Sequence, residues 1–365
     1  MKVGIFVNTP AQWHFWKNIT KKLIEEGNEV RTLFRDYGET LEVVDFVEKY
    51  VYSPKANSKY MKMLSLPLDI FRAYNFLKSF KPDIVSGLGV YEALTSVMLR
   101  KPSVSFEDSE PSVNKSLKLQ YKLYSPFLDV VITPESFLDD LGKKQIRVAS
   151  YKELAYLHPN YYSPKDDVLD LMGVSKGEDY VLLRFNAFSA VHDIGVFGFT
   201  YEDKIRLVKE LEKHARVFIS SEAKLPEGLE DYALKVSKKR IHDVIYHAKL
   251  LIADTQTMTT EAAILGTPAI RCNKFVGPKD MGNFIELEKK YGLIYNFPVS
   301  EKDRAIEKAI ELVQKENLKK EWQKKRERLL KDKIDITAFM VWFIENYPES
   351  FNEFKENPEI QYRFR

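Results

Sequence analysis

The sequence predicts an α/β protein of two domains, each built on a doubly wound parallel sheet. Its 365 residues exceed the roughly 100–200 that one packed domain usually holds. Short runs rich in valine and isoleucine alternate with amphipathic segments, which is typical of βα units on a parallel sheet. Between about residues 156 and 177 the alternation stops, proline, asparagine, aspartate, serine and glycine accumulate, and then the alternation restarts. This interruption predicts a linker between two separate sheets.

The first domain is expected over residues 1–158. It opens with an apolar strand at 3–7, a loop at 8–12 and a helix at 14–26 that Gly27 ends. Further strands are expected at 29–34, 83–86, 103–106 and 129–133, with a helix at 91–99. Because the first residues already read as a strand, no signal peptide is expected ahead of them.

The second domain is expected over residues 178–334, after a linker at 159–177. Its strands are expected at 180–184, 216–220, 250–254 and 269–271, and its helices at 201–214, 241–248, 259–265 and 302–316. In the remaining residues, 335–365, Asp335 can cap an apolar, aromatic helix at 336–347. A helix this apolar must be buried, and we expect it to cross back onto the first domain.

Composition and charge exclude several classes of protein. The net charge is only +3, too balanced for the broad basic face that binding to a nucleic-acid backbone needs. No uncharged apolar run approaches the roughly 20 residues that span a bilayer. Cys272 is the only cysteine, so no intramolecular disulfide can form, and the six histidines lack metal-ligand spacing. We therefore expect a cytoplasmic protein with neither a metal site nor a nucleic-acid partner.

The most informative loop follows the strand expected at 250–254. Open α/β sheets bind ligands at the carboxyl ends of their strands, so this loop borders the expected cleft between the domains. Backbone N–H groups at the start of the next helix, with the hydroxyls of Thr255, Thr257 and Thr259, suit a phosphate. Glu261 repels that phosphate unless it accepts hydrogen bonds from ribose hydroxyls. The alternative is that Thr255 or Thr257 caps the helix and Glu261 complements its dipole.

The stretch from Asp254 to Arg271, D-T-Q-T-M-T-T-E-A-A-I-L-G-T-P-A-I-R, resembles the D-S-G-G-x-Q-E-E-A-x-x-L-G-x-P-x-x-x-R segment of the UDP-N-acetylglucosamine 2-epimerases and related GT-B glycosyltransferases. Two phrases resemble the uncharacterised family called domain of unknown function 354. They are N-T-P-x-x-x-H-F at 8–15, and R-F at 184–185 followed by H-D-I-G at 192–195. This resemblance covers nearly the whole chain. It implies the GT-B architecture, with two Rossmann-like domains facing a cleft, and a UDP-sugar substrate in the carboxy-terminal domain without a further cofactor.

In the epimerase-like enzymes the backbone of this loop holds the diphosphate, and the glutamate before the alanine binds the ribose. The resemblance therefore assigns the diphosphate to Thr255, Gln256, Thr257 and the adjoining Met258, and the ribose to Glu261.

Basic residues near the same edge are further candidates. Arg184 ends the first strand of the second domain and can neutralise the diphosphate, with Ser189 and His192 in the loop that follows. The alternative for Arg184 is a structural salt bridge. Arg271 and Lys274 are weaker candidates for the same role.

Departures from the epimerases bear on the reaction. Gln256 and Thr257 replace a glycine pair, which restricts backbone approach to the phosphates, so side chains can donate instead. Leu88 replaces the acid of the H-G-D-T-T-T phrase, and only Glu107 remains of the V-E-A-G-L-R phrase. Epimerisation by elimination and re-addition needs several acid/base groups around the sugar. We therefore expect a glycosyltransferase, with a 2-epimerase-like enzyme and a non-catalytic nucleotide-sugar-binding or regulatory protein as alternatives.

Glycosyl transfer needs a base for the acceptor hydroxyl, and two groups can supply it. His14 lies where the similar lipid-linked muropeptide N-acetylglucosaminyltransferase has the histidine of its G-G-T-G-G-H phrase, although the glycines are absent. It can instead pack against its own helix. Glu107, Asp108 and Glu110 form a crowded acidic cluster, where a carboxyl can have a raised pKa unless the loop is solvated.

Residues 59–80 and 115–127 interleave basic with apolar and aromatic residues. Such a pattern can dock a protein onto anionic lipid near a lipid-linked acceptor. The commoner explanation is an apolar stripe that faces the core below a solvated basic face. The sequence leaves open the acceptor, the sugar and the oligomeric state, a homodimer included.

Overall fold

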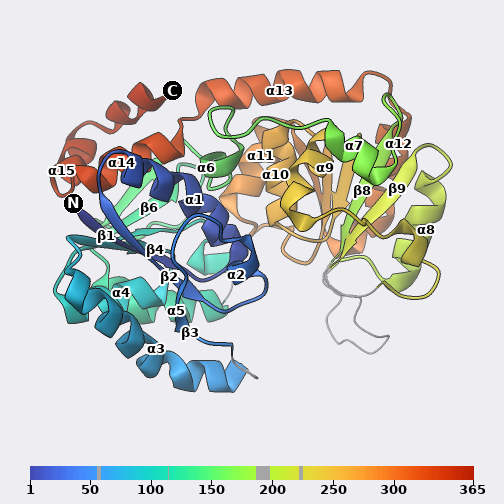
Figure 1. The fold of residues 1–365 in the computed structure, drawn as a ribbon. Helices are drawn as coiled ribbons and strands as arrows, with labels where there is room; N and C mark the ends of the chain where they lie inside the picture. Colours follow the sequence, from blue (N-terminus) through green and yellow to red (C-terminus); the bar gives the residue numbers. More distant parts are fainter. Residues whose placement is uncertain (56–58, 114, 186–197, 222–224) are drawn as a thin grey trace. The chain divides into compact units, whose positions relative to one another are not determined.

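The structure is a computed structural model that describes residues 1–55, 59–113, 115–185, 198–221 and 225–365. The chain forms two compact units. Unit 1 holds Met1–Tyr161 together with Lys333–Arg365, and unit 2 holds Tyr162–Asp332. Each unit contains a parallel sheet with helices on both faces (Figure 1). The prediction of two doubly wound parallel sheets is thereby confirmed.

The sheet of unit 1 has seven parallel strands in the order β3-β2-β1-β4-β5-β6-β7. They are β1 (Lys2–Val7), β2 (Glu29–Arg35), β3 (Tyr50–Ser53), β4 (Ile84–Gly87), β5 (Ser103–Phe106), β6 (Val130–Pro134) and β7 (Gln145–Val148). Val3 of β1 pairs with Val30 of β2 on one side and with Ile84 of β4 on the other, so the strand order reverses at β1. At such a reversal the loops leave toward opposite faces, which leaves room for a ligand at the carboxyl edge.

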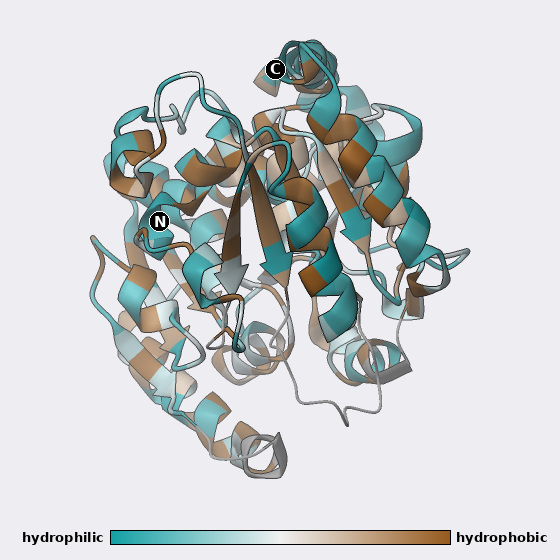
Figure 2. Ribbon diagram, turned by 90° about the vertical axis from the view of Figure 1, so that its right-hand side faces the viewer, coloured by the Kyte–Doolittle hydropathy of each residue, from teal (hydrophilic) through white to brown (hydrophobic). Residues whose placement is uncertain are grey.

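Helices cover both faces of this sheet. On one face α1 (Pro10–Glu25), α6 (Leu154–Leu157) and α14 (Ile336–Glu345) pack together, and on the other lie α3 (Lys59–Phe80), α4 (Val90–Leu99) and α5 (Lys115–Tyr124) (Figure 1). The short helices α2 (Thr40–Val43) and α15 (Glu349–Glu356) complete the unit. Figure 2 shows helices banded with hydrophobic and hydrophilic residues, as expected for helices that bury one side.

Helix α1 begins at Pro10 rather than at the predicted residue 14. Thr9 caps it, because its hydroxyl oxygen accepts a hydrogen bond from the Gln12 N–H at 3.3 Å. Pro10 occupies the first position, where a missing N–H costs nothing and the fixed φ suits a helix. The earlier start extends the helix over the loop that was expected to stay irregular.

The carboxy-terminal segment is held within unit 1. Asp335 caps α14, as predicted, by accepting a hydrogen bond from the Ala338 N–H at 3.0 Å. The Thr337 hydroxyl donates to the Ala155 carbonyl at 3.0 Å, and the Ile334 N–H donates to the Ala149 carbonyl at 2.8 Å. These bonds tie the buried, aromatic side of α14 to the core of unit 1.

The sheet of unit 2 has five parallel strands in the order β12-β11-β10-β8-β9. They are β8 (Tyr180–Phe185), β9 (Arg216–Ser221), β10 (Leu250–Ala253), β11 (Ala269–Cys272) and β12 (Ile294–Phe297). Its helices are α7 (Asp167–Met172), α8 (Tyr201–Leu211), α9 (Ile241–His247), α10 (Thr257–Leu265), α11 (Gly282–Lys289), α12 (Lys302–Gln314) and α13 (Leu318–Asp332). Within the described residues of both units, no helix combines the length and apolarity needed to cross a membrane.

Candidate functional site

Three neighbouring strands of unit 2 end at the same edge of the sheet. Arg184 of β8 pairs with Ala253 of β10, and Ala253 pairs with Arg271 of β11. The following residue, Asp254, is buried and starts the loop to α10. Asn273 donates from Nδ2 to the Asp254 carbonyl at 3.2 Å, which ties this loop to the end of β11. The loop therefore starts from a fixed point at the carboxyl edge, where open α/β sheets bind ligands.

The start of α10 presents backbone donors. Gln256 is the N-cap residue, and no side chain caps the helix, so the alternative in which Thr255 or Thr257 is the cap is wrong. The N–H groups of Thr259 and Thr260 both donate to the Gln256 carbonyl, at 3.1 and 3.2 Å. Within the described residues, the N–H groups of Thr257 and Met258 have no acceptor. These two groups carry the positive end of the helix dipole.

The threonine hydroxyls around this helix start differ from one another. Thr259 donates from Oγ1 to the Thr255 carbonyl at 2.9 Å, so its hydroxyl is used by the helix itself. Thr255 Oγ1 is buried and lacks a hydrogen-bond partner in the described part of the chain. Because a buried hydroxyl ordinarily has a partner, the Thr255 hydroxyl is free to bond to a polar ligand group. Among the predicted phosphate ligands, Thr255 is therefore the one whose buried hydroxyl lacks a hydrogen-bond partner within the described residues.

Glu261 lies one turn into α10, buried beside His242 of α9. His242 Nε2 is 3.1 Å from Glu261 Oε1, and its ring packs edge-on against Tyr162 with ring centres 6.2 Å apart. The imidazole therefore fixes the direction of the carboxylate that the sequence assigned to a ribose. Sequence reasoning missed His242, because nothing in the local pattern around it points to α10.

Lys204 lies beneath the same loop and was also missed. It belongs to α8, is 6 % exposed, and places Nζ 3.9 Å from Asp254 Oδ2 and 4.9 Å from the centre of the Phe185 ring. Burial lowers the pKa of the Lys204 ammonium, and the charge of Asp254 opposes that shift. The buried cation balances Asp254, which would otherwise add negative charge beside the start of α10, where the sequence predicts a diphosphate.

Gly198 packs against this loop so closely that no side chain fits. A Cβ atom added there would lie 2.3 Å from Asp254 Cβ and 2.8 Å from the Cys272 carbonyl oxygen. Both neighbours are fixed by the sheet, so they cannot move aside as the tip of a flexible side chain would.

Replacing Gly198 by alanine is therefore expected to lower the free energy of unfolding by about 1–3 kcal/mol, as overpacking does. The matched control is Gly277→Ala, since a Cβ at Gly277 would meet no atom within 4 Å. Urea titration of both variants measures the difference. Equal stability of the two variants would contradict the close approach.

Of the five remaining candidates in unit 2, the structure describes three. Arg184 is half-buried, and its Nη1 donates to Ser220 Oγ at 3.3 Å. Arg271 is fully buried, forms an ion pair with Asp280 and places its guanidinium carbon 3.5 Å from the centre of the Phe284 ring, so it links β11 to α11. Lys274 Nζ lies 5.5 Å from the centre of the Phe275 ring. Ser189 and His192 lie outside the described residues.

In unit 1, His14 and Asp108 are each engaged by a neighbour. The His14 ring is half-buried on α1 and lies 5.2 Å, centre to centre, from the ring of Tyr156. Asp108 forms an ion pair with Lys152. Glu110 is buried and accepts a hydrogen bond from the Leu138 N–H at 3.2 Å, so the solvated-loop alternative is wrong for this residue.

Glu107 and Glu92 form a carboxyl pair around Ser105 at the carboxyl edge of unit 1. Ser105 Oγ lies 3.3 Å from Glu107 Oε1 and 3.1 Å from Glu92 Oε1, and the Tyr124 hydroxyl donates to Glu107 at 2.9 Å. Glu92 Oε2 is buried without a partner among the described residues. Burial raises the pKa of Glu92 to about 8, and the charge of Glu107 adds to the rise. Burial also raises the pKa of Glu107 to about 7, although the hydrogen bond from Tyr124 opposes it.

The raised pKa of Glu92 should make the fold less stable at high pH. The unfolded chain releases this proton near pH 4.5 and the folded chain near about 8, so the stability present below pH 4.5 is lost as the pH rises through about 8. Glu92→Gln should therefore gain more than about 1 kcal/mol relative to the original chain between about pH 5 and about pH 9. Denaturant titrations at both pH values measure this, with exposed Glu356→Gln as the control. A difference that does not change with pH would contradict the assignment.

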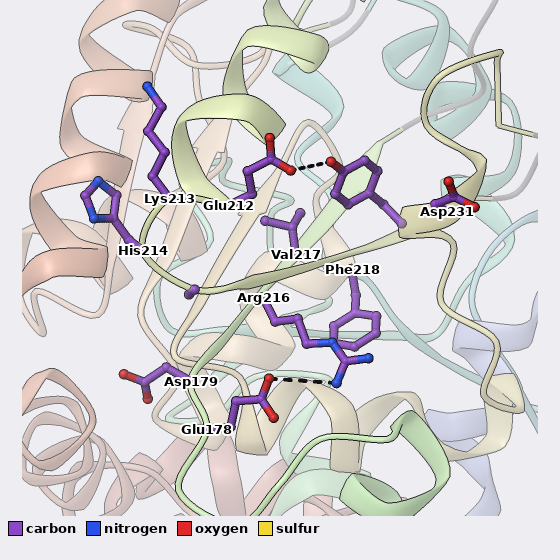
Figure 3. A pocket seen from close by; sticks show the side chains of 11 residues that line it. Glu178, Asp179, Glu212, Lys213, His214, Arg216, Val217, Phe218 and Asp231 are labelled. Atoms are coloured by element: carbon purple, nitrogen blue, oxygen red, sulfur yellow. Dashed lines mark hydrogen bonds and ion pairs between the residues drawn. The ribbon is translucent and has the colours of Figure 1, made fainter.

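A surface hollow of about 750 Å³ lies elsewhere on unit 2 (Figure 3). Its walls include Glu178 and Arg216, an ion pair at 3.8 Å, together with Asp179 and His214. These residues stand at the amino ends of β8 and β9, the opposite edge of the sheet from the α10 loop. The hollow is therefore separate from the candidate site. Within the described residues, no cluster of three or more His, Cys, Asp or Glu side chains is placed to hold a metal ion.

Comparisons with known proteins agree with the fold described above. A family model described as a protein of unknown function, DUF354, matches residues 1–344. An uncharacterised protein of Methanocaldococcus jannaschii is 24% identical over 289 residues, which are 74% of this chain and 82% of that protein.

Among solved structures, S. aureus MnaA in complex with UDP superposes with a TM-score of 0.67 at 12% identity, covering 96% of this chain and 97% of that one. MurG of Acinetobacter baumannii superposes with a TM-score of 0.57 at 15% identity, covering 94% of this chain and 99% of MurG. At these identities the likeness establishes the GT-B fold and leaves the activity to the site.

Proposed function

The chain belongs to the DUF354 family, and we propose that this member binds a UDP-sugar in unit 2 and transfers the sugar to an acceptor, as a glycosyltransferase. The observation that carries the proposal is the start of α10. Two backbone N–H groups and the buried Thr255 hydroxyl have no partner within the described residues, and they lie at the carboxyl edge of a parallel sheet. Such donors select an anion with several oxygens, which a diphosphate supplies.

The diphosphate lies against residues 255–258 in this proposal. The N–H groups of Thr257 and Met258 donate to its oxygens, and the Thr255 hydroxyl gains the partner that it lacks. Arg184 lies next to the end of the adjoining strand β8 and adds positive charge at the same edge. The buried Lys204 offsets Asp254, so the net field at the loop favours an anion.

The ribose lies toward Glu261. Its carboxylate accepts hydrogen bonds from the ribose hydroxyls, and charge-assisted bonds of this kind are stronger than neutral ones. His242 holds the carboxylate from the side of α9. The choice of uridine over other bases is supported by the likeness to MnaA, whose structure contains UDP.

Transfer of the sugar follows from a base and a stabilised leaving group. A carboxylate takes the proton of the acceptor hydroxyl. The acceptor oxygen then bonds to the anomeric carbon of the sugar, and the bond from that carbon to the diphosphate breaks. The negative charge that develops on UDP meets the donors at the start of α10. Glu107 is the base that we favour over His14 and Asp108, because its pKa of about 7 suits proton transfer near neutral pH.

A 2-epimerase-like reaction is the second candidate, and Glu92 favours it. Few acid/base residues of the epimerase motifs are present in this chain for elimination and re-addition. Glu92 and Glu107, however, form a pair with pKa values of about 8 and about 7. Epimerisation at C2 breaks the C2–H bond, so UDP-N-acetylglucosamine incubated with the protein in D₂O would gain deuterium at C2. Glycosyl transfer leaves that hydrogen in place.

Calorimetric titration with UDP, ADP and GDP tests the donor site directly. We expect saturable binding of UDP in preference to the other two. If none of the three nucleoside diphosphates gives binding heat, the proposal is contradicted, and a non-catalytic role for the GT-B fold would replace it.

A further inference from the structure

Exposed apolar side chains concentrate on one face of unit 1. Of the 17 large apolar side chains exposed in the described part of the chain, nine lie on α3, α4, α5 and the following turn at Ser125–Phe127. We call this surface the α3–α5 face, and its exposed apolar residues are Leu64, Leu68, Phe71, Val97, Met98, Leu117, Leu119, Leu123 and Phe127. The three helices form one layer of the unit, since α4 packs against both α3 and α5 (Figure 1).

Helix α3 is apolar on two sides. Its inner side contributes Ala73 and Leu77 to the core, as any helix packed on a sheet does. Its outer side carries Leu64, Leu68 and Phe71, which are 73, 59 and 52% exposed. Their spacing of four and three residues puts them on one stripe of the helix. A helix whose outer side faces only water is polar there, so this stripe indicates a second contact.

Helix α5 repeats the pattern. Leu119 and Leu123, one turn apart, are 62 and 66% exposed, whereas Tyr124 is buried. Thus the core does not cover the leucines that sequence patterning alone would assign to it. The commoner explanation, a stripe that faces the core, is wrong for these side chains.

The charged groups of the same face have one sign. Among the side chains described on these elements, the exposed charged ones are Arg72, Lys78, Lys118 and Lys122. The two carboxylates described there, Asp69 and Glu92, are both buried. The whole chain has a net charge of only +3, so a face without exposed carboxylates is a local departure from the rest.

We propose that the α3–α5 face docks onto an anionic lipid surface. Its leucines and Phe71 enter the boundary between headgroups and acyl chains, while the lysines and arginines bind lipid phosphates. Apposition of this face with the same face of a second copy would bring cations against cations with no carboxylate to pair them. The inference goes beyond the proposed transfer reaction and rests on unit 1 alone.

Flotation of the full chain with lipid vesicles tests the proposal. We expect it to float with vesicles of phosphatidylcholine and phosphatidylglycerol at low salt, and far less with phosphatidylcholine alone. Leu119→Gln and Leu123→Gln should each weaken binding about tenfold, since each removes one buried apolar side chain. Lys118→Gln and Lys122→Gln should each weaken it about fivefold, and only for the anionic vesicles.

Leu171→Gln is the matched control, because Leu171 of α7 in unit 2 is as exposed as Leu119, at 62%. It should float like the original chain. Failure of the original chain to float with anionic vesicles at low salt would overturn the proposal, as would an equal loss in Leu171→Gln. A dimer in sedimentation that Leu119→Gln dissociates, without flotation, would overturn it in favour of a second copy. UDP titration of each variant shows whether its donor site is intact, so a failure of lipid binding can be told apart from a failure of the donor site.

Discussion

Replacing Glu261 by glutamine is expected to weaken UDP binding roughly 10- to 150-fold. Hydrogen bonds to a charged group contribute about 1.5–3 kcal/mol, and the substitution removes the charge while keeping the size of the side chain. Glu261 is buried against His242, so its carboxylate has a fixed direction. A water molecule in its place would not restore the lost binding free energy. Calorimetric titration of UDP into both proteins measures the effect.

The ribose assignment is tested more sharply by removing the other partner. With 2′-deoxy-UDP, the original chain should bind more weakly than with UDP, whereas Glu261→Gln should distinguish the two ligands much less. This cycle isolates the contact between carboxylate and sugar from any general damage to the site. Exposed Glu307→Gln serves as a control that should bind UDP normally. Equal discrimination against the deoxy ligand by both proteins would contradict the ribose role.

The interior strands could be predicted from sequence, and three edge strands could not. β1, β8 and β10 are largely apolar runs buried on both faces, which is the strongest strand pattern. The missed strands β3, β7 and β12 all stand at the edges of the two sheets. An edge strand has only one neighbour and tolerates polar residues, such as Gln145 and Arg147 in β7, so its pattern is weak.

The residues of the candidate site likewise divide into those that could be predicted from the sequence and those that could not. The α10 loop could be found because its donors are contiguous in the sequence and follow a strong strand. His242, Lys204 and Glu92 reach their positions from other helices, and only tertiary packing brings them there. Glu92 lies in the first turn of α4, four residues after Leu88, which replaces the acid of the H-G-D-T-T-T phrase. A comparison by motif alone therefore underestimates the acid/base groups of unit 1.

Replacing Glu107 by glutamine is expected to lower turnover of UDP-N-acetylglucosamine by about 10²–10⁴-fold, the usual contribution of a general base. The natural acceptor is unknown, so the rate is measured as hydrolysis of the UDP-sugar, in which water is the acceptor and UDP is released. UDP affinity should stay unchanged, because the donor groups belong to unit 2. A parallel loss of UDP binding would contradict a purely catalytic role for Glu107.

The pH profile decides whether Glu107 acts as a base. A base works when deprotonated, so the rate should rise with pH through about 7, the raised pKa of this carboxyl, and level off above it. Glu107→Gln should abolish that rise, and Glu107→Asp should restore part of it. If the rate instead falls as the pH passes about 7, the working form is protonated. The carboxyl would then donate a proton to the leaving group or the sugar, which is the chemistry that the epimerase-like candidate requires.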